Sequence, residues 1–336
     1  MKRTIAVLYG GIGVEHEVSL SGYSYMKELL ESLGHEILPI YITRTGEWQL
    51  KQDKQVKSVF PSQFCDGSIT DDSSGKYTHI DAAIPLLHGD GGESGEIQGL
   101  LKASGIPFVG ASTITGAVCI DKHYAKCVAQ SLDIPVAKWV AFSKKTDTDA
   151  ALAICEDGIG FPMFIKPRRL GSSVGAYPVR DKDNFYKRFE ESMNAGNNLV
   201  IVEEMFDKKR ELECAFYGVR GEQRLSVPGE ILAHGFYGYD EKYNKNTTTT
   251  PRARICDSVA SEIQKYNELL SDAFSLRHLA RIDYFLTDKG VIFNEINTFP
   301  GFTAHSLYPR LLSEMGIEPV DAIAAFIEDA INARAV

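Results

Sequence analysis

The amino-acid sequence predicts an α/β fold that begins with a doubly wound unit, and three observations indicate it. A buried-type strand at residues 4–9 leads through the glycine turn 10–13 into a helical stretch at 18–33. Strand and helix patterns keep alternating through residues 111–202. Beyond them the sequence is rich in strand patterns and contains a hairpin at 281–297.

The first predicted unit spans residues 1–110. It continues with strands at 37–42 and 82–87, and the polar stretch 66–76 between them is expected to be irregular. The segment 11–16 falls short of a dinucleotide-binding fingerprint because His16 replaces the third glycine. We therefore interpret it as a substrate loop and not as an NAD site.

The second and third predicted units span residues 111–202 and 203–336. The second is a smaller α/β unit whose helices and strand are expected at residues 122–132, 147–157 and 163–166. The third has strands at 199–204 (across the boundary), 212–217 and 231, the hairpin, and a closing amphipathic helix at 319–334. Residues 244–250, with four consecutive threonines, predict a mobile surface loop.

Size and composition indicate a soluble cytoplasmic protein. A chain of 336 residues is long enough for two or three domains. The net charge of −9, from 36 Lys and Arg against 45 Asp and Glu, argues against a nucleic-acid partner but permits a basic cleft for a small anion. The six cysteines form no CxxC pair, which is typical of reduced thiols. No apolar run is long enough to span a membrane.

The hairpin at 281–297 is the most informative segment. If residues 288–290 form a three-residue loop, Thr287 pairs with Val291. Paired residues lie on the same face, and side chains alternate along each strand. This register places four polar side chains on one face: Arg281, Asp283, Glu295 and Asn297.

Two carboxylates that face each other across a hairpin repel, so Asp283 and Glu295 imply a cation between them. Together with the amide of Asn297 they form an oxygen-only ligand set, which suits Mg²⁺ or Mn²⁺. A Mg²⁺ held by few protein ligands usually also binds substrate phosphates. The alternative is a solvated hairpin face whose charges point into water.

A second group of residues suits phosphate binding. The buried-type strand 161–167 delivers Lys166 beside the Gly- and Ser-rich loop 171–175, whose N–H groups and hydroxyls can hold phosphate oxygens. Lys122, at a helix start, is a candidate second phosphate lysine. The chain has no GxxxxGK[ST] motif, which excludes a P-loop NTPase. The alternatives are a flexible turn and a solvated surface lysine.

A third group lies where the strand 199–204 ends. Glu203 and Glu204 close this strand and Glu211 follows seven residues after Glu204. Carboxylates and amides at such a strand-to-loop junction can bind an adenine edge and ribose hydroxyls. An acidic surface loop explains these three residues equally well.

Taken together, these groups identify a family resemblance. The chain resembles the D-alanine–D-alanine ligases of the ATP-grasp superfamily along almost its whole length. The matching segments, in family order, are residues 10–11 and 15–20, 88–93 and 95–99, 121–122, 166–167 and 171–175, 236–237 and 242–243, 281–283, 294–298, 300–303 and 308–309.

The resemblance implies an ATP-grasp fold behind an N-terminal doubly wound (pre-ATP-grasp) domain. It implies ATP-dependent joining of two D-alanines through an acyl phosphate, for peptidoglycan precursor synthesis. The implied cofactors are ATP and two ions of Mg²⁺ or Mn²⁺. The implied partners are these small molecules and a second copy of the chain in a homodimer.

The resemblance also assigns roles to individual residues. The implied nucleotide ligands are Lys122, Lys166, Ser173, Glu203, Glu204, Phe206 and Glu211. The implied metal ligands are Asp283, Glu295 and Asn297. The implied catalytic groups are Glu15, Ser172, Tyr243, Arg281 and Gly301, and the implied substrate-binding groups are His88, Lys242, Ser306 and Leu307.

Three of these roles concern the first D-alanine and a lid. Glu15 would pair with the ammonium of the first D-alanine, near His88. Ser172 would link Glu15 to Tyr243 and so close the loop 236–250, which carries Lys242, over the site.

Two further roles concern the second D-alanine. Arg281 and the N–H of Gly301 would form an oxyanion hole. Ser306 and Leu307 would contact the second D-alanine.

Departures from the family pattern bear on the second substrate. Gly238 replaces an aspartate that the family commonly has in the lid, and we expect this to loosen the lid. His305 resembles the D-alanine–D-serine ligases of vancomycin resistance, but Leu307 stands where those enzymes typically have arginine. Tyr243 disfavours D-lactate. We therefore expect D-alanine at both positions. The alternatives are a D-alanine–D-serine or D-lactate ligase and, in another class, a nucleotide-binding protein without catalysis.

Overall fold

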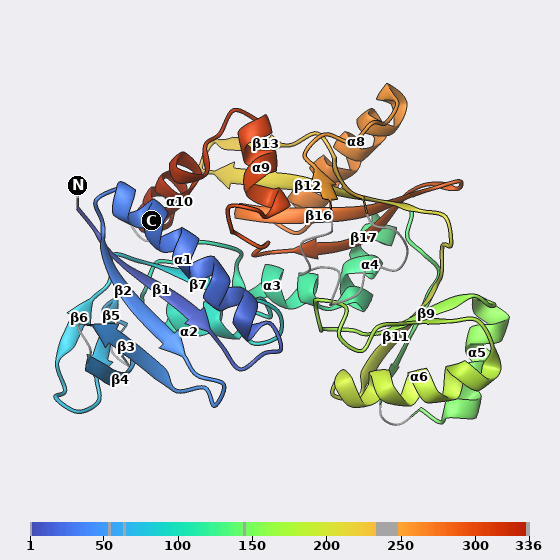
Figure 1. The fold of residues 1–336 in the computed structure, drawn as a ribbon, viewed down its shortest axis with the longest axis horizontal. Helices are drawn as coiled ribbons and strands as arrows, with labels where there is room; N and C mark the ends of the chain where they lie inside the picture. Colours follow the sequence, from blue (N-terminus) through green and yellow to red (C-terminus); the bar gives the residue numbers. More distant parts are fainter. Residues whose placement is uncertain (1, 53–54, 63–64, 144–145, 233–247, 334–336) are drawn as a thin grey trace.

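Three β-sheets with helices packed against them form the frame of the molecule (Figure 1). The computed structural model describes all residues except 1, 53–54, 63–64, 144–145, 233–247 and 334–336. In Figure 1 the six-stranded C-terminal sheet, yellow to red, lies above the N-terminal sheet at the left and the four-stranded sheet at the right.

The N-terminal sheet is built on three parallel strands: β1 (Thr4–Gly10), β2 (Glu36–Ile42) and β7 (Ala82–Leu86). Side chains alternate along β1, so Ile5 packs under helix α1 (His16–Ser32) while Ala6 packs toward helix α2 (Glu96–Ala103). Apolar side chains on both faces of β1 explain why both faces are covered by helices. The predicted doubly wound unit is therefore present.

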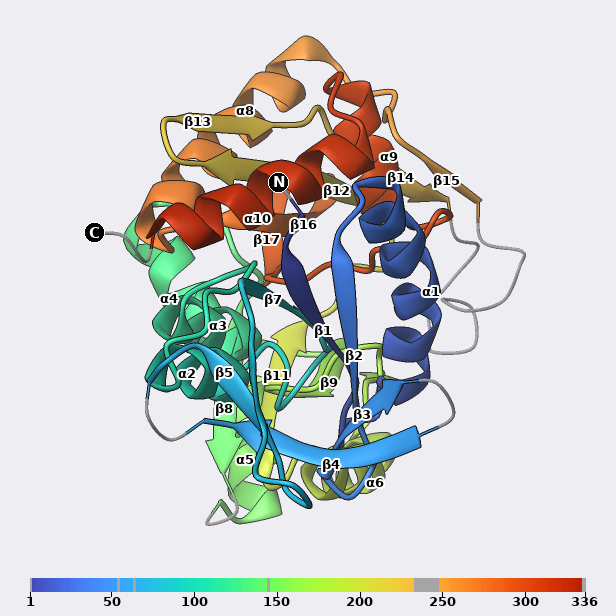
Figure 2. The same cartoon turned by 90° about the vertical axis from the view of Figure 1, so that its left-hand side faces the viewer.

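Four antiparallel strands extend this sheet beyond β2: β3 (Trp48–Gln52), β4 (Gln55–Pro61), β5 (Ser68–Asp71) and β6 (Tyr77–His79). Figure 2 shows this extension bending away from the parallel strands. The expectation that 66–76 is irregular was wrong for β5, whose four residues are all buried. The extension lacks the apolar runs that reveal a strand, because polar residues such as Ser68 and Asp71 are buried by pairing and hydrogen bonding.

The four-stranded antiparallel sheet has the order β10-β9-β11-β8. Its strands are β8 (Trp139–Ser143), β9 (Met163–Pro167), β10 (Tyr177–Val179) and β11 (Leu199–Glu204). Helices α5 (Thr148–Gly158) and α6 (Lys182–Ala195) share one apolar core with it. The preceding helices α3 (Thr113–Ile120) and α4 (Lys122–Ser131) pack instead in the core of the C-terminal sheet, beside β17 (Gly290–Asn297).

The C-terminal sheet has the order β15-β14-β12-β16-β17, and β13 pairs with β12. Its strands are β12 (Arg210–Val219), β13 (Glu222–Leu225), β14 (Gly229–Leu232), β15 (Thr248–Thr250), β16 (His278–Thr287) and β17. Helix α8 (Asp257–Ala273) covers one face, and α9 (Leu307–Glu314) and α10 (Pro319–Ala333) cover the other. The predicted loop at 244–250 is a strand over β15, and its first four residues lie outside the described residues.

One apolar cluster joins the two ends of the chain. It contains Ile5 and Met26 from the N-terminal unit and Leu311 and Phe326 from α9 and α10. The domain boundaries predicted at 110 and 202 stay predictions.

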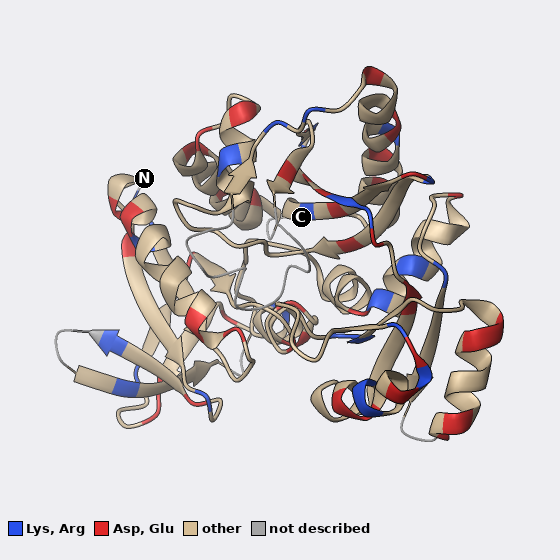
Figure 3. Cartoon of the chain, turned by 45° about the vertical axis from the view of Figure 1, so that its right-hand side comes forward, with Lys and Arg blue, Asp and Glu red and all other residues tan. Residues whose placement is uncertain are grey.

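Lys and Arg (blue) and Asp and Glu (red) are both spread along the chain (Figure 3). No helix within the described part of the chain has the length and apolar character needed to cross a membrane.

Candidate active site

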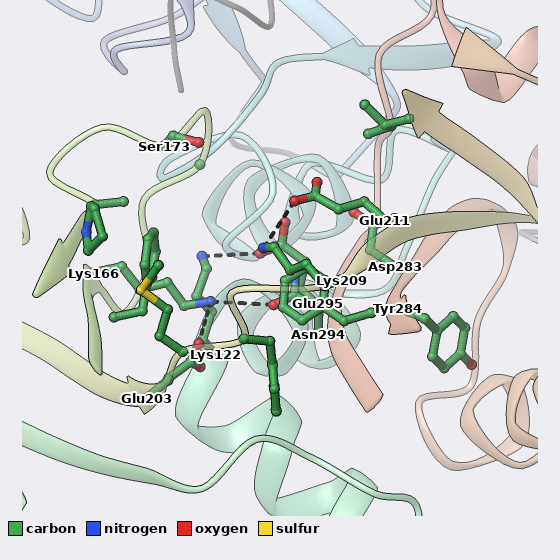
Figure 4. A pocket seen from close by; sticks show the side chains of 18 of the residues that line it. Lys122, Lys166, Ser173, Glu203, Lys209, Glu211, Asp283, Tyr284, Asn294 and Glu295 are labelled. Carbon is green, nitrogen blue, oxygen red and sulfur yellow. Dashed lines mark hydrogen bonds and ion pairs between the residues drawn. The ribbon is translucent and has the colours of Figure 1, made fainter. Parts of the chain in front are cut away.

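A cavity of about 450 Å³ lies between the four-stranded sheet and the C-terminal sheet. Its walls come from β9, the loop 171–175 and β11 on one side and from β12, β16 and β17 on the other. Lys122, Lys166, Glu203, Asp283 and Glu295 all line it (Figure 4). The structure therefore brings the predicted phosphate, adenine and metal groups into one place.

The hairpin that supplies the carboxylates differs from the prediction in its turn. Thr287 pairs with Gly290, so the loop has two residues and not three. A β-bulge between Asp283 and Tyr284 adds one residue to β17 and restores the predicted pairing of Asp283 with Glu295 and of Arg281 with Asn297. The four predicted side chains therefore share one face.

Arg281 and Asp283 form a two-pronged ion pair on this face. Arg281 donates from Nε and Nη2 to the two carboxylate oxygens of Asp283 at 2.8 and 2.7 Å, and Asn297 donates to Oδ2 of the same carboxylate at 3.0 Å. Burial alone would lower the pKa of Arg281, but Asp283 and Glu213 outweigh burial and raise it well above its usual range. Arg281 is thus a fixed cation at the base of the cavity.

Glu213 is a third carboxylate here that sequence reasoning missed. It lies opposite Asp283 on the neighbouring strand β12, is 5% exposed, and accepts from Arg281 Nε at 3.2 Å. Its period-two spacing from Glu211 along one strand was the available signal, because residues i and i+2 share a face.

The lysines on the opposite wall are held by carboxylates. Lys166 Nζ is 2.8 Å from Glu203 Oε2 and donates to Asn294 at 3.4 Å, while Lys122 Nζ is 3.5 Å from Glu295 Oε2. Burial would raise the pKa of Glu203, but its lysine neighbours lower it to about 2. Both predicted phosphate lysines are therefore held in place by carboxylates.

Lys126 is the second lysine that forms an ion pair with Glu203, and no role was predicted for it. It is 1% exposed and its Nζ lies 3.2 Å from Glu203 Oε1. Burial lowers the pKa of Lys126, and the nearby Glu203 opposes this shift. Lys126 follows Lys122 by four residues, so both lie on one face of α4, a spacing that could have revealed it.

The loop 171–175 is tied down by the start of α4. Asp121 is fully buried, caps α4 through the N–H of His123, and accepts from Arg168 at 3.0 and 2.8 Å and from Arg169 at 3.1 Å. Lys122 donates from its main-chain N–H to the carbonyl of Arg168 and from Nζ to that of Leu170. The arginines before the loop therefore bind Asp121.

The tip of this loop reaches Glu15. Ser172 and Ser173 adopt left-handed conformations, with φ of 50° and 57°, which cost energy for non-glycine residues. Ser172 donates from Oγ to Glu15 Oε1 at 2.5 Å, and a Cβ on Gly171 would lie 2.7 Å from Glu15 Oε2. The structure thus brings the predicted pair Glu15 and Ser172 together.

The segment 88–93 lies beside Glu15. A Cβ on Gly89 would lie 2.4 Å from Glu15 Oε2, so the glycine permits this close approach. His88 is buried, and its Nδ1 lies 3.1 Å from the carbonyl oxygen of Phe299. Burial lowers the pKa of His88, and Glu15 and the Phe299 carbonyl oppose this shift. A neutral His88 therefore joins the N-terminal unit to the loop that precedes Gly301.

Ser306 and Leu307 differ in their surroundings. Ser306 Oγ accepts from Thr303 N–H at 3.1 Å and would lie 3.3 Å from a Cβ on Gly301. Leu307 is 7% exposed and packs in the apolar cluster with Leu311. Ser306 is thus adjacent to Gly301, whereas the Leu307 side chain is part of the core.

The remaining predicted nucleotide ligands also line the cavity. Glu204 forms an ion pair with Lys289, which lies over the ring of Phe206, and Glu211 is 3.0 Å from Lys209. Lys242, Tyr243 and Gly238, and most of the predicted lid, lie outside the described residues.

The donors fit a hard divalent cation. The described residues contain no group of three or more His, Cys, Asp or Glu side chains placed to hold a metal ion. Asp283 and Glu295 offer two carboxylates, and the Asn297 amide offers one neutral oxygen. The remaining metal ligands would have to come from substrate phosphates and water. This matches Mg²⁺, which is usually held by one or two carboxylates together with substrate phosphates and water.

Comparison with known proteins adds sequence relatives over most of the chain. A sequence model described as "D-ala D-ala ligase N-terminus" matches residues 4–111, and one described as "D-ala D-ala ligase C-terminus" matches residues 128–328. The D-alanine--D-alanine ligase of Oceanobacillus iheyensis is 33% identical over 99% of this chain and 96% of its own length.

Solved structures agree with these matches. The D-alanyl-alanine synthetase A from Vibrio cholerae superposes with a TM-score of 0.89 at 31% identity, over 98% of this chain and 99% of that one. The VanG D-Ala:D-Ser ligase from Enterococcus faecalis superposes with a TM-score of 0.86 at 32% identity, over 99% of this chain and all of that one.

Proposed function

This chain belongs to the D-alanine–D-alanine ligase family, and we propose that it joins two D-alanines to D-alanyl-D-alanine, converting ATP to ADP and phosphate, for peptidoglycan precursor synthesis. Its mixed α/β structure is the ATP-grasp fold of that family. The observation that carries the proposal is that Arg281, Asp283 and Glu295 line one cavity with Lys122 and Lys166, and that Asn297 shares the face of the hairpin with the first three.

The first step activates a carboxylate, which is a poor acylating agent. The carboxylate of the first D-alanine attacks the γ-phosphorus of ATP, the bond to the β-phosphate oxygen breaks, and ADP leaves an acyl phosphate behind. Lys122 and Lys166 would offset the charge on the transferred phosphoryl group, and Ser173 in the loop 171–175 would bind its oxygens. Glu15 would hold the ammonium of the first D-alanine.

The second step forms the peptide bond. The deprotonated amine of the second D-alanine attacks the acyl phosphate carbon, and inorganic phosphate leaves. The carbonyl oxygen becomes negative, and Arg281 and the N–H of Gly301 would stabilise it. A preorganised donor of this kind is worth about 3–4 kcal/mol in a site without water.

We propose that Asp283, Glu295 and Asn297 hold two Mg²⁺ or Mn²⁺ ions when ATP is bound. These ions would neutralise charge on the β- and γ-phosphates. Glu203, Glu204, Phe206 and Glu211 would surround the adenine and ribose. We further propose, from the family resemblance, a cytoplasmic homodimer, which light scattering on the eluted protein would test.

D-Alanine as the second substrate is favoured by the sequence at position 307, where D-alanine–D-serine ligases typically have arginine: this chain has a leucine, whose side chain packs in the apolar cluster and offers no donor for a serine hydroxyl. The second candidate, D-alanyl-D-serine formation, is supported by His305 and by the likeness to the VanG enzyme.

Product analysis separates the candidates. Purified protein, ATP and Mg²⁺ are incubated with D-alanine alone and in equimolar competition with D-serine or D-lactate. We expect D-alanyl-D-alanine as the main product, with one phosphate released per dipeptide. Preferential D-alanyl-D-serine would overturn the choice of second substrate. Absence of phosphate release that depends on both D-alanine and Mg²⁺ would overturn the ligase assignment.

A further inference from the structure

Glu93 is a buried carboxylate that none of the proposed steps uses. It is 8% exposed and lies in the segment 88–93, whose Gly89 lies against the carboxylate of Glu15. We infer that Glu93 is a positioning residue that fixes the ammonium-binding side of the substrate site relative to its oxyanion-binding side. This inference rests on the proposed ligase function.

The first contact of Glu93 is with its own segment. Its Oε2 accepts from the main-chain N–H of Gly89 at 3.0 Å. Gly89 in turn lies against the carboxylate of Glu15, so close that no side chain fits between them. By holding Gly89, Glu93 fixes one wall of the place where Glu15 would bind the ammonium of the first D-alanine.

The second contact of Glu93 crosses to the C-terminal unit. Its Oε1 accepts from the main-chain N–H of Phe299 at 2.8 Å, across 206 positions of sequence. Phe299 precedes Gly301 by two residues, and its ring is 4% exposed. By holding Phe299, Glu93 fixes the start of the loop that presents the N–H of Gly301 to the oxyanion.

His88 completes the attachment of Phe299. Its Nδ1 lies 3.1 Å from the Phe299 carbonyl oxygen, so the six-residue segment 88–93 of the N-terminal unit binds both the N–H and the C=O of the same residue. Two main-chain bonds to one residue define its position and its orientation. A side chain needed only for packing would not have to satisfy both groups.

The environment of Glu93 disfavours a charged carboxylate at this position. Burial and the nearby Glu15 raise the pKa of Glu93 to about 7, while the N–H groups of Gly89 and Phe299 oppose the shift. An apolar residue would fill the space without that cost. A carboxylate is suited to this position because its two acceptor oxygens can bind both N–H groups.

The test uses Glu93→Gln in the full-length protein. The amide retains one acceptor oxygen and turns an N–H₂ group toward the other main-chain N–H, so one of the two attachments is lost. We expect kcat for D-alanyl-D-alanine to fall about 10- to 100-fold while KM for ATP changes less than about threefold. We also expect more than one phosphate released per dipeptide, because a misplaced oxyanion donor leaves the acyl phosphate to water.

Glu96→Gln is the matched control. Glu96 is exposed, three residues further on, and makes no contact with Phe299 among the described interactions. It should keep wild-type kcat and one phosphate per dipeptide. If Glu93→Gln does not fold, Glu93→Asp serves instead, since its shorter carboxylate keeps the charge but cannot span both N–H groups.

The outcomes are distinct. A lower melting temperature with unchanged kcat and unchanged coupling would show that Glu93 is merely structural and would overturn the inference. If the wild-type protein itself forms no dipeptide, the proposed function is wrong, and this result is distinct from a failure of the inference on Glu93. A loss of kcat with excess phosphate release in Glu93→Gln alone supports the inference.

Discussion

At the scale of single residues, Arg281 contacts two carboxylates at once. It pairs with both oxygens of Asp283, a proposed metal ligand, and lies against Glu213. A guanidinium can do this because it has five donors in a planar fork, whereas a lysine ammonium cannot bind two oxygens side by side in this way. The same side chain therefore orders the proposed metal-binding face and would supply the oxyanion cation.

Arg281→Ala tests the oxyanion role. Because the charge on the carbonyl oxygen exists only in the transition state, we expect kcat to fall about 10²- to 10³-fold with little change in KM for ATP. Arg224→Ala, which breaks an exposed ion pair with Glu222, is the control and should be neutral. Steady-state kinetics with varied ATP decide, and a raised KM with normal kcat contradicts the role.

Lys126→Met tests the buried triad of Lys126, Lys166 and Glu203. Removing one cation leaves Glu203 Oε1 without its ion pair in a buried position, so we expect the free energy of unfolding to fall by about 3 kcal/mol. KM for ATP should rise more than kcat falls, since the triad borders the nucleotide cavity. Urea unfolding and ATP titration measure both. Lys102→Met, on an exposed helix position, should change neither.

At the scale of elements, the hairpin shows how a prediction can reach the correct register by an incorrect turn. A three-residue loop and a two-residue loop with one bulge shift the strands by the same amount. The turn signal in the sequence located the loop, and the two facing carboxylates required a common face. The bulge itself lies between Asp283 and Tyr284, and no local sequence pattern marks it.

Strands β3 to β6 escaped prediction, as did β8, β10, β13 and β15. Strands β3 to β6 extend the N-terminal sheet with short segments rich in polar residues, and the burial of Asp71 depends on its pairing with Val59 and on its ion pair with Lys57. By contrast, β1, β2, β7, β9, β11 and β17 have apolar runs that reveal them locally. Likewise Lys122 and Lys166 were found from motifs. The spacing of Lys126 and Glu213 indicates only which face they share with a predicted residue, and their ion pairs, like the contacts of Glu93, follow from the tertiary structure.

Asp121→Asn tests the junction of α4 with the phosphate-binding loop. The amide can still cap the helix, but it cannot balance Arg168 and Arg169 in a buried site, so we expect a loss of about 3 kcal/mol in the free energy of unfolding. Asp147→Asn, an exposed cap on α5 that has no such ion pair among the described residues, should cost less than about 1 kcal/mol. Equal losses in thermal or urea unfolding would refute the loop-anchoring role.

At the scale of the whole molecule, His278 joins three distant segments. Its Nδ1 accepts from the N–H of Gly110 at 2.9 Å, and its Nε2 donates to Asp329 of α10 at 3.1 Å. Burial lowers the pKa of His278 to about 4. The hydrogen bond that Asp329 accepts from His278 lowers the pKa of Asp329 to about 2. The neutral ring is therefore the form that the fold accommodates.

Stability should consequently fall on acidification. Between pH 6.5 and pH 4 the unfolded chain binds a proton at His278 that the folded protein does not, so the free energy of unfolding decreases by about 3 kcal/mol as pH falls through that window. His278→Asn, which tolerates the left-handed backbone at this position, should remove this slope. Urea unfolding from pH 4 to 7 measures it. His79→Asn, an exposed control, should keep the slope, and a variant curve parallel to wild type would refute the prediction.

Each lysine and arginine that lines the cavity is already paired with a carboxylate: Lys122 with Glu295, Lys166 with Glu203, Arg180 with Asp207, Lys209 with Glu211, and Arg281 with Asp283. These five Lys and Arg side chains line the cavity together with seven Asp and Glu side chains, so a polyphosphate that entered alone would add to an excess of negative charge in a buried space. Divalent counter-ions offset this charge. Nucleotide and metal should therefore be thermodynamically linked, each raising the affinity of the other by the same factor of about 5 to 150. Calorimetric titration of ADP with and without Mg²⁺ would reveal this linkage, and equal affinities would disprove it.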